Sequence, residues 1–289
     1  MAVADWIRIA ILSLVWGGSF FFVEVMLEAM PPMTSVLGRL IVGLAGLVGL
    51  LKLLGHPLRP LMTQWRSFAW IGLINNAIPF SLISFGQTEI TGSLASIINA
   101  STPIMTAVVA HQLTTDERLS LRKALGIAFG FGGVLVLFGP TAIQGGASLL
   151  GMAAGLTATV CYAFGSVYSK RLKSNPPMLN ATGQVLYGTL WMFPVVCLID
   201  QPWSLPMPGI GPWLALMGIG LLSTTLAFFI YFRVLKTAGA SNVVLVTFLV
   251  PVSASALGIV FLGEVLAIQH ILAYLLIALG LAIIDGRIV

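Results

Sequence analysis

The sequence carries very little charge. Only 8% of its 289 residues are Asp, Glu, Lys or Arg, whereas a soluble domain has roughly 25%. Hydrophobic residues make up 58% of the chain, and one membrane-spanning helix needs about 20 apolar residues. This composition excludes an ordinary soluble domain. The apolar runs are continuous and do not alternate, which argues against a transmembrane β-barrel.

Cysteine and histidine are also scarce, with two and three residues respectively. Cys161 and Cys197 lie inside apolar segments without the spacing of a disulfide framework or a metal site, so we predict no metal and no cofactor. No segment carries paired Asp residues or a His beside a Ser at its centre, as intramembrane proteolysis would require. We therefore predict that the protein is not an enzyme. The net charge of +5 is spread over loops, so no nucleic-acid partner is expected.

Ten long apolar segments account for most of the chain. They cover residues 6–27, 33–54, 67–88, 93–112, 121–139, 148–170, 178–199, 211–234, 241–262 and 266–285. Thirteen of the fourteen Lys and Arg residues fall in loops on one side of these segments, and none falls on the other side. Loops rich in Lys and Arg stay in the cytoplasm, so both termini are predicted to be cytoplasmic. The sequence predicts an all-α integral membrane protein with ten transmembrane helices.

The chain also repeats itself. Matching features occur in the same order in residues 1–140 and 141–289: Trp16-Gly17-Gly18-Ser19 with Tyr162-Ala163-Phe164-Gly165, Pro31-Pro32 with Pro176-Pro177, and Pro103 with Pro251. Each half holds five segments, and because five is odd the second half must enter the membrane from the opposite face. Inverted repeats of this kind are common in secondary transporters, with the binding site near the midplane between the repeats.

Polar residues gather at the centres of six segments: the first, third and fourth, and their counterparts the sixth, eighth and ninth. Polar groups in hydrocarbon need partners or water, so we predict one wet cavity, with the other four segments packed outside it. Hydrogen bonds between helices are the structural alternative. The predicted substrate-binding residues are Trp16, Ser19, Asn75, Asn76, Phe80, Ser81, Asn99, Thr102, Tyr162, Thr225, Phe229 and Thr247.

Proline interrupts the polar segments in matching places. Pro103 and Pro251 occupy equivalent positions, and Pro79 follows the Asn75-Asn76 pair and frees a backbone carbonyl. Interrupted helices in corresponding positions point to the binding site of a transporter, although a proline can equally produce a static kink. We predict gating or structural roles for these three prolines.

Charged groups are missing from the centres of the segments. Without a carboxylate or histidine there, the sequence shows no proton relay at the midplane, which favours a facilitative carrier or an exchanger. Arg39 is the exception, about two turns or roughly 10 Å into its helix. An intramembrane Arg is a functional hypothesis by default. We predict an outer-gate salt bridge to Glu24 or Glu89, or a contact to a substrate carboxylate; the alternatives are a structural ion pair or a side chain that extends to the membrane surface.

Small residues concentrate in two segments. Gly126, Gly130 and Gly133 lie in the fifth segment and Gly280 in the tenth, and such residues let helices approach closely. They predict either packing within one chain or a homodimer through the fifth and tenth helices.

Together these motifs resemble the EamA type of the drug/metabolite transporter superfamily over essentially the whole chain. The resemblance is carried by Trp16-Gly17-Gly18-Ser19-Phe20, Arg39 in Leu37-Gly38-Arg39-Leu40, Ala95-Ser96-Ile97-Ile98 through Pro103, Glu117 followed by Leu121, Gly126 and Gly133, and, in the second half, Pro251, Leu262-Gly263-Glu264 and Gly280. Thr115-Asp116-Glu117 departs from the Leu-Gly-Glu that is frequent in the family, without affecting the expected fold.

This resemblance implies a secondary transporter in the bacterial inner membrane that works by alternating access. Its expected substrates are aromatic or neutral amino acids and related amines, exported from the cytoplasm. The alternatives are the export or exchange of cationic drugs or of a sugar or nucleotide-type metabolite, or the flipping of a lipid-linked substrate. The expected partners are a small-molecule substrate and membrane lipid.

Overall fold

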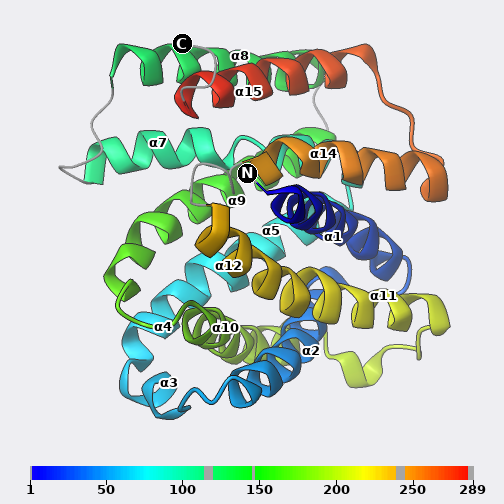
Figure 1. Ribbon diagram of the computed structural model, residues 1–289. Helices are drawn as coiled ribbons and strands as arrows, with labels where there is room; N and C mark the ends of the chain where they lie inside the picture. Colours follow the sequence, from blue (N-terminus) through cyan, green and yellow to red (C-terminus); the bar gives the residue numbers. More distant parts are fainter. Residues whose placement is uncertain (1, 114–119, 145–146, 239–244, 286–289) are drawn as a thin grey trace.

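The computed structural model describes residues 2–113, 120–144, 147–238 and 245–285, and all regular structure in these ranges is helical (Figure 1). The first part contains α1 (Val3–Leu27), α2 (Pro32–Leu53), α3 (Arg59–Thr63), α4 (Trp65–Gly72), η1 (Leu73–Ala77), α5 (Ile78–Gly86), α6 (Gly92–Asn99), α7 (Thr102–Leu113) and α8 (Leu121–Gln144). The second contains α9 (Ala147–Ser169), η2 (Lys170–Leu172), α10 (Pro177–Ile199), η3 (Pro202–Ser204), α11 (Ile210–Gly220), η4 (Leu221–Leu226), α12 (Ala227–Ala238), α14 (Leu245–Leu257), η5 (Gly258–Leu262) and α15 (Ile268–Asp285). The predicted features at Glu117 and Arg287 lie outside the described residues.

Eight helical segments of the described chain are long and apolar enough to cross a membrane. They are Val3–Leu27, Pro32–Leu53, Trp65–Gly86, Gly92–Leu113, Ser148–Leu172, Pro177–Ile199, Ile210–Ala238 and Leu245–Leu262. Two shorter apolar stretches, Ala124–Val136 and Ile268–Ile283, coincide with the predicted fifth and tenth segments. The predictions of an all-helical chain and of multiple long apolar helices are thus confirmed.

The helices stack in layers (Figure 1). Helices α8 and α15 lie side by side at one edge of the molecule, with α7 and α14 beneath them. Helix α1 packs along α14 and α11, α9 packs against α5 and α7, and α10 packs against α2 and α4. These pairings join helices from the two halves of the chain, so the interior of the molecule is built by both halves.

The glycines of the fifth and tenth segments are used inside the chain. A Cβ at Gly280 would lie 2.5 Å from the Gly126 carbonyl oxygen and 2.8 Å from the Gly130 nitrogen, and one at Gly133 would lie 2.7 Å from the Ala273 carbonyl oxygen. The absence of side chains therefore lets α8 and α15 approach to backbone contact. These glycines therefore serve helix packing within one chain, as one of the two predictions stated. A homodimer through these helices stays a prediction.

The polar helices are interrupted near their centres. The third segment contains the π-helical turn η1 between α4 and α5, and the eighth contains the π-helical turn η4 between α11 and α12. Such turns are rare, and many of them lie at functional sites. Asn75 and Asn76 lie on η1, and Ser223 and Thr224 lie on η4. The non-α turns therefore coincide with the polar positions.

Proline explains two of these interruptions. Pro79 has no N–H to offer the carbonyl of Asn75, and in the widened turn Ile78 N–H donates to the Leu73 carbonyl five residues earlier. The fourth segment divides into α6 and α7 just before Pro103, and the Thr102 hydroxyl donates to the Asn99 carbonyl at 2.7 Å in place of the missing amide. Pro251, in contrast, lies inside the continuous helix α14.

Candidate functional site

A cavity of about 330 Å³ lies at the level of these interruptions. It is lined by Trp16, Ser19, Phe20, Val23, Arg39, Asn75, Asn76, Phe80, Ile83, Gln87, Ser96, Asn99, Ala100, Thr102, Pro103, Tyr162, Gln184, Ser223, Thr224, Phe228, Thr247, Val250 and Pro251. The lining includes four aromatic side chains from Phe and Trp, one Tyr, five amides and one Arg, but no Asp or Glu among the residues that the structure describes. The cavity is thus largely apolar and rich in rings, with neutral amide and hydroxyl groups and one positive charge in its lining.

Helical spacing places these residues on one face of each helix. In α1 the lining positions are 16, 19, 20 and 23, and from η1 to the residue after α5 they are 75, 76, 80, 83 and 87. Residues three and four apart lie on the same face of a helix, so each of these helices presents a continuous stripe to the cavity.

Most of the predicted substrate-binding residues meet in this cavity. Nine of the twelve are in the lining: Trp16, Ser19, Asn75, Asn76, Phe80, Asn99, Thr102, Tyr162 and Thr247. Three of the residues predicted to act in gating, Arg39, Pro103 and Pro251, line it too. Residues from helices far apart in the sequence therefore converge on one space.

The other three predicted binding residues lie elsewhere. The Ser81 hydroxyl faces Met192 Sδ at 3.4 Å, and the Thr225 hydroxyl lies 3.2–3.3 Å from the carbonyls of Gly220 and Gly43. Phe229 faces a separate hollow, with the Arg233 guanidinium 5.2 Å from its ring centre. Each is a near neighbour of a lining residue, and adjacent residues in a helix point about 100° apart.

Two predicted gating residues are also displaced from the lining. Pro79 is buried at the start of α5, where it shapes the backbone. Glu24 does not pair with Arg39: its Oε2 accepts a hydrogen bond from the Gly92 amide at 2.9 Å. Among the described residues, the one ion pair found joins Arg8 and Asp5. Arg39 therefore makes no salt bridge to Glu24 or Glu89, and the predicted outer-gate ion pair is wrong.

The cavity also includes residues beyond the predicted substrate-binding set; of these, Arg39 was predicted to form an outer-gate salt bridge or to contact a substrate carboxylate. Gln184 comes from α10 and Arg39 from α2, two helices that the sequence placed outside the cavity. The sequence did show Gln184 as an amide inside the apolar seventh segment, and that was the signal by which it could have been found. Gln87 could have been found from its spacing, eleven residues or about three turns after Asn76. Ser223, Thr224 and Phe228 replace their neighbours Thr225 and Phe229.

Arg39 is held in the cavity by two contacts. The centre of its guanidinium lies 3.9 Å from the centre of the Phe80 ring, and its Nε donates to the Thr224 hydroxyl at 3.4 Å. Thr224 in turn donates to the Ile219 carbonyl at 3.1 Å, five residues earlier across the π turn. The interruption of the eighth segment thus orients the hydroxyl that receives Arg39.

The amides in the lining are only partly satisfied. Asn75 donates to Gln184 Oε1 at 3.3 Å, and Gln87 donates to the Phe20 carbonyl at 2.9 Å. Within the described part of the chain, buried polar atoms of Asn75, Asn76, Gln87 and Asn99 have no hydrogen-bond partner. An unpaired buried group of this kind costs about 1–3 kcal/mol, and such groups call for a partner such as a ligand or water.

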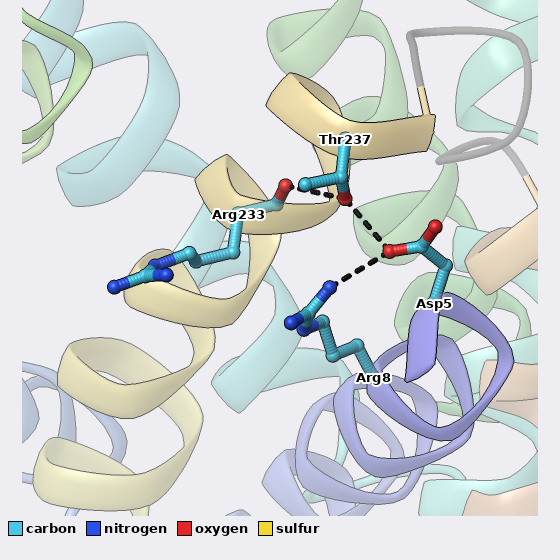
Figure 2. A network of polar contacts seen from close by, with 4 residues as sticks. All are labelled: Asp5, Arg8, Arg233 and Thr237. Carbon is cyan, nitrogen blue, oxygen red and sulfur yellow. Dashed lines mark hydrogen bonds and ion pairs between the residues drawn. The ribbon is translucent and has the colours of Figure 1, made fainter. Parts of the chain in front are cut away.

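A polar network joins α1 to α12 at one end of the bundle (Figure 2). The Thr237 hydroxyl on α12 donates to Asp5 Oδ1 on α1 at 2.7 Å, and Arg8 Nη1 donates to the same oxygen at 2.8 Å. Arg233 contributes its backbone carbonyl, 2.9 Å from the Thr237 hydroxyl, while its side chain points away from Asp5. The network fixes the N-terminal end of α1 against the C-terminal end of α12.

At the other end of α1, two carboxylates converge on the N-terminus of α6. Glu24 accepts from Gly92 N–H, and Glu264 accepts from Ser93 N–H at 3.2 Å. The free amides at a helix N-terminus favour negative groups, so these contacts stabilise the start of α6. They connect the end of α1 and the segment after η5 to the fourth segment.

Comparison with known proteins gives consistent relatives. Protein PecM of Dickeya dadantii is 27% identical over 277 residues, covering 94% of this chain and 89% of that protein. The uncharacterized inner membrane transporter YedA of Escherichia coli K12 is 24% identical, covering 89% of this chain and 82% of YedA. The uncharacterized transporter YoaV of Bacillus subtilis is also 24% identical, with coverage of 93% and 92%. One solved crystal structure matches with a TM-score of 0.68 at 20% identity, covering 98% of this chain and 96% of that one, which shows a shared fold.

The fold and the cavity define a multi-pass helical membrane protein with a cavity lined by residues from many of its helices. The model of the EamA-like transporter family matches the chain twice, at residues 6–139 and 149–285. The chain belongs to this family, within the drug/metabolite transporter superfamily. The resemblance drawn from the sequence motifs is thereby confirmed.

Proposed function

We propose that the protein is a secondary transporter that exports small metabolites, most of all aromatic or neutral amino acids and related amines, across the bacterial inner membrane by alternating access. The observation that carries the proposal is the cavity, which is lined by helices from both family repeats. At about 330 Å³ it lies at the small end of ligand sites, which span about 300–1,000 Å³. That size suits one small molecule better than a lipid-linked substrate or a large drug.

Contacts between helix ends support the proposed topology of ten helices with both termini inside. Thr34, at the start of the second segment, donates to Asp200, which follows the seventh. Gln64 and Asn175 bond to each other through their side-chain amides from the loops after the second and sixth segments. If consecutive segments cross the membrane in opposite directions from a cytoplasmic N-terminus, both members of the first pair lie outside. Both members of the second pair then lie inside.

The matched interruptions support an inverted repeat of residues 1–140 and 141–289. The third and eighth segments are equivalent under the proposed repeat, and each carries a π-helical turn with polar residues at its centre. Broken helices in corresponding positions commonly form the substrate site at the midplane of a transporter. In alternating access, the two repeats would rock about this site.

The test is substrate exchange in liposomes with the purified protein. Vesicles loaded with an unlabelled amino acid are expected to take up the same labelled amino acid, and Asn76→Ala is expected to reduce the initial rate about tenfold, because a hydrogen bond to substrate is lost. Asn76 is 2% exposed and lines the cavity.

Ser81→Ala is the matched control, since Ser81 follows Asn76 on the same segment but faces Met192. It should exchange at the rate of the unmodified protein. No exchange of any amino acid in a panel of aromatic, aliphatic and polar members would contradict the proposed function. Equal exchange by Asn76→Ala and Ser81→Ala would contradict the proposed site.

A further inference from the structure

Arg39 brings a full positive charge into the cavity. It lies in the second turn of α2, within a span of 22 residues of mean hydropathy 2.0, and its side chain is half-buried in the lining. A charged residue at such a depth is costly unless it is paired or faces a water-filled space. Its role therefore depends on what neutralises it.

The protein supplies no counter-ion within the described residues. Four described carboxylates accept hydrogen bonds from other groups. Glu24 accepts from Gly92, Glu264 accepts from Ser93, Asp200 accepts from Thr34, and Asp5 accepts from Arg8 and Thr237. None of these bonds involves Arg39. The charge of Arg39 is left for a group that is not part of the described chain.

The contacts of Arg39 leave its binding edge free. Phe80 covers one face of the guanidinium at 3.9 Å, and Thr224 occupies Nε. The hydrogen bonds of a guanidinium lie in its plane, so stacking on a ring does not consume them. The two Nη groups have no acceptor among the described residues, and together they form the fork that binds a carboxylate with two parallel hydrogen bonds.

We infer that Arg39 binds the carboxylate of the transported molecule, so that the substrates are small carboxylates, including zwitterionic amino acids, and not their decarboxylated amines. This inference rests on the proposed transport function and narrows its substrate class. It separates amino acids from the related amines and cationic drugs that the family resemblance also allows.

The rest of the lining is suited to such a molecule. Phe80, Trp16 and Tyr162 provide apolar surface for a side chain. The amides of Asn75, Asn76 and Asn99 provide neutral hydrogen-bonding groups, each with a buried atom that lacks a partner in the described chain. The unpaired Oδ1 atoms of Asn75 and Asn99 can accept hydrogen bonds from an ammonium group without an acidic residue, and the carboxylate of the same zwitterion neutralises Arg39.

The experiment measures binding to the purified, detergent-solubilised protein by isothermal titration calorimetry, with ligands matched in all but their charged groups. One set is phenylalanine, 3-phenylpropionate and phenethylamine, and a second is leucine, 4-methylpentanoate and 3-methylbutylamine. In at least one set the two carboxylates are expected to bind about tenfold or more tightly than the amine, because a hydrogen bond to a charged group is worth about 1.5–3 kcal/mol.

Variants locate the preference. Arg39→Gln is expected to remove the discrimination between carboxylate and amine, whereas Arg39→Lys, which keeps the charge but loses the fork, should keep part of it. Arg66→Gln is the matched control, because Arg66 also lies near a ring, 5.4 Å from Trp65, but outside the cavity. It should bind all ligands as the unmodified protein does.

The inference is overturned if no carboxylate in either set binds more tightly than its amine, or if Arg39→Gln keeps the full preference. Because the ligand comparison uses the unmodified protein, it remains decisive even where a variant fails to fold. Binding is measured without a membrane gradient, so carboxylate selectivity without exchange in liposomes would overturn only the transport function. Exchange of amines and carboxylates at equal rates would overturn only the role of Arg39.

Discussion

Gly17→Leu is expected to lower the apparent melting temperature of the purified protein by about 5–10 °C. A Cβ at Gly17 would lie 2.7 Å from Ser253 Cβ, 2.8 Å from the Ala254 nitrogen and 2.9 Å from the Val250 carbonyl oxygen. Two of these are backbone atoms, which cannot rotate away, so any side chain must push α1 from α14. Overpacking of this kind lowers the free energy of unfolding by about 1–3 kcal/mol. The measurement is the loss of monodisperse protein after heating.

The matched control is Gly49→Leu, in α2. A Cβ at Gly49 would meet no heavy atom within 4 Å, so the same substitution should leave the melting temperature within a degree or two of the unmodified protein. Equal destabilisation by both variants would mean that the close contact of α1 and α14 does not determine the stability of the bundle.

Thr237→Val is expected to open the cavity to reagents from the side of the membrane on which α1 begins, which is the cytoplasmic side in the proposed topology. The variant keeps the shape of the side chain but removes the hydroxyl that joins α12 to Asp5 on α1 (Figure 2). Loss of this hydrogen bond to a carboxylate favours states in which the two helix ends are apart. The measurement is the rate at which a membrane-impermeant maleimide labels Thr102→Cys in the cavity, in inside-out vesicles after replacement of Cys161 and Cys197.

Thr189→Val is the control for this experiment, because the Thr189 hydroxyl bonds only to the Val185 carbonyl of its own helix at 2.8 Å. Labelling should proceed at the original rate in that variant. An unchanged rate in Thr237→Val would show that the network does not hold the inner ends of α1 and α12 together.

Much of the fold could be predicted from the sequence. Apolar length and composition gave the helices, because an uninterrupted run of about 20 apolar residues has few other stable forms. The positions of Pro79 and Pro103 indicated where helices are interrupted, since proline cannot donate to the preceding turn. The family followed from motifs such as Trp16-Gly17-Gly18-Ser19 and Leu262-Gly263-Glu264, and the match to both repeats confirmed it.

The sequence also indicated which helices carry polar centres, but it could not show which individual side chains point into the cavity. Thr224 lines the cavity and Thr225 does not, and Phe228 lines it while Phe229 faces another hollow. Adjacent residues differ by about 100° in direction, and the extra residue in the turn η4 rotates everything that follows it. Helices that are apolar on nearly all sides carry little periodicity from which this rotation could be read.

By itself the sequence determined that this chain is a helical membrane protein with internal repetition and polar groups at the centres of its helices. Only the tertiary structure decided which groups meet. It placed Glu24 on the N-terminus of α6 instead of beside Arg39, and it brought Arg39 and Gln184 into the cavity from helices expected to lie outside it. The reason is that helix length and burial depend on local composition, whereas pairing across a cavity depends on how several helices rotate and pack against one another.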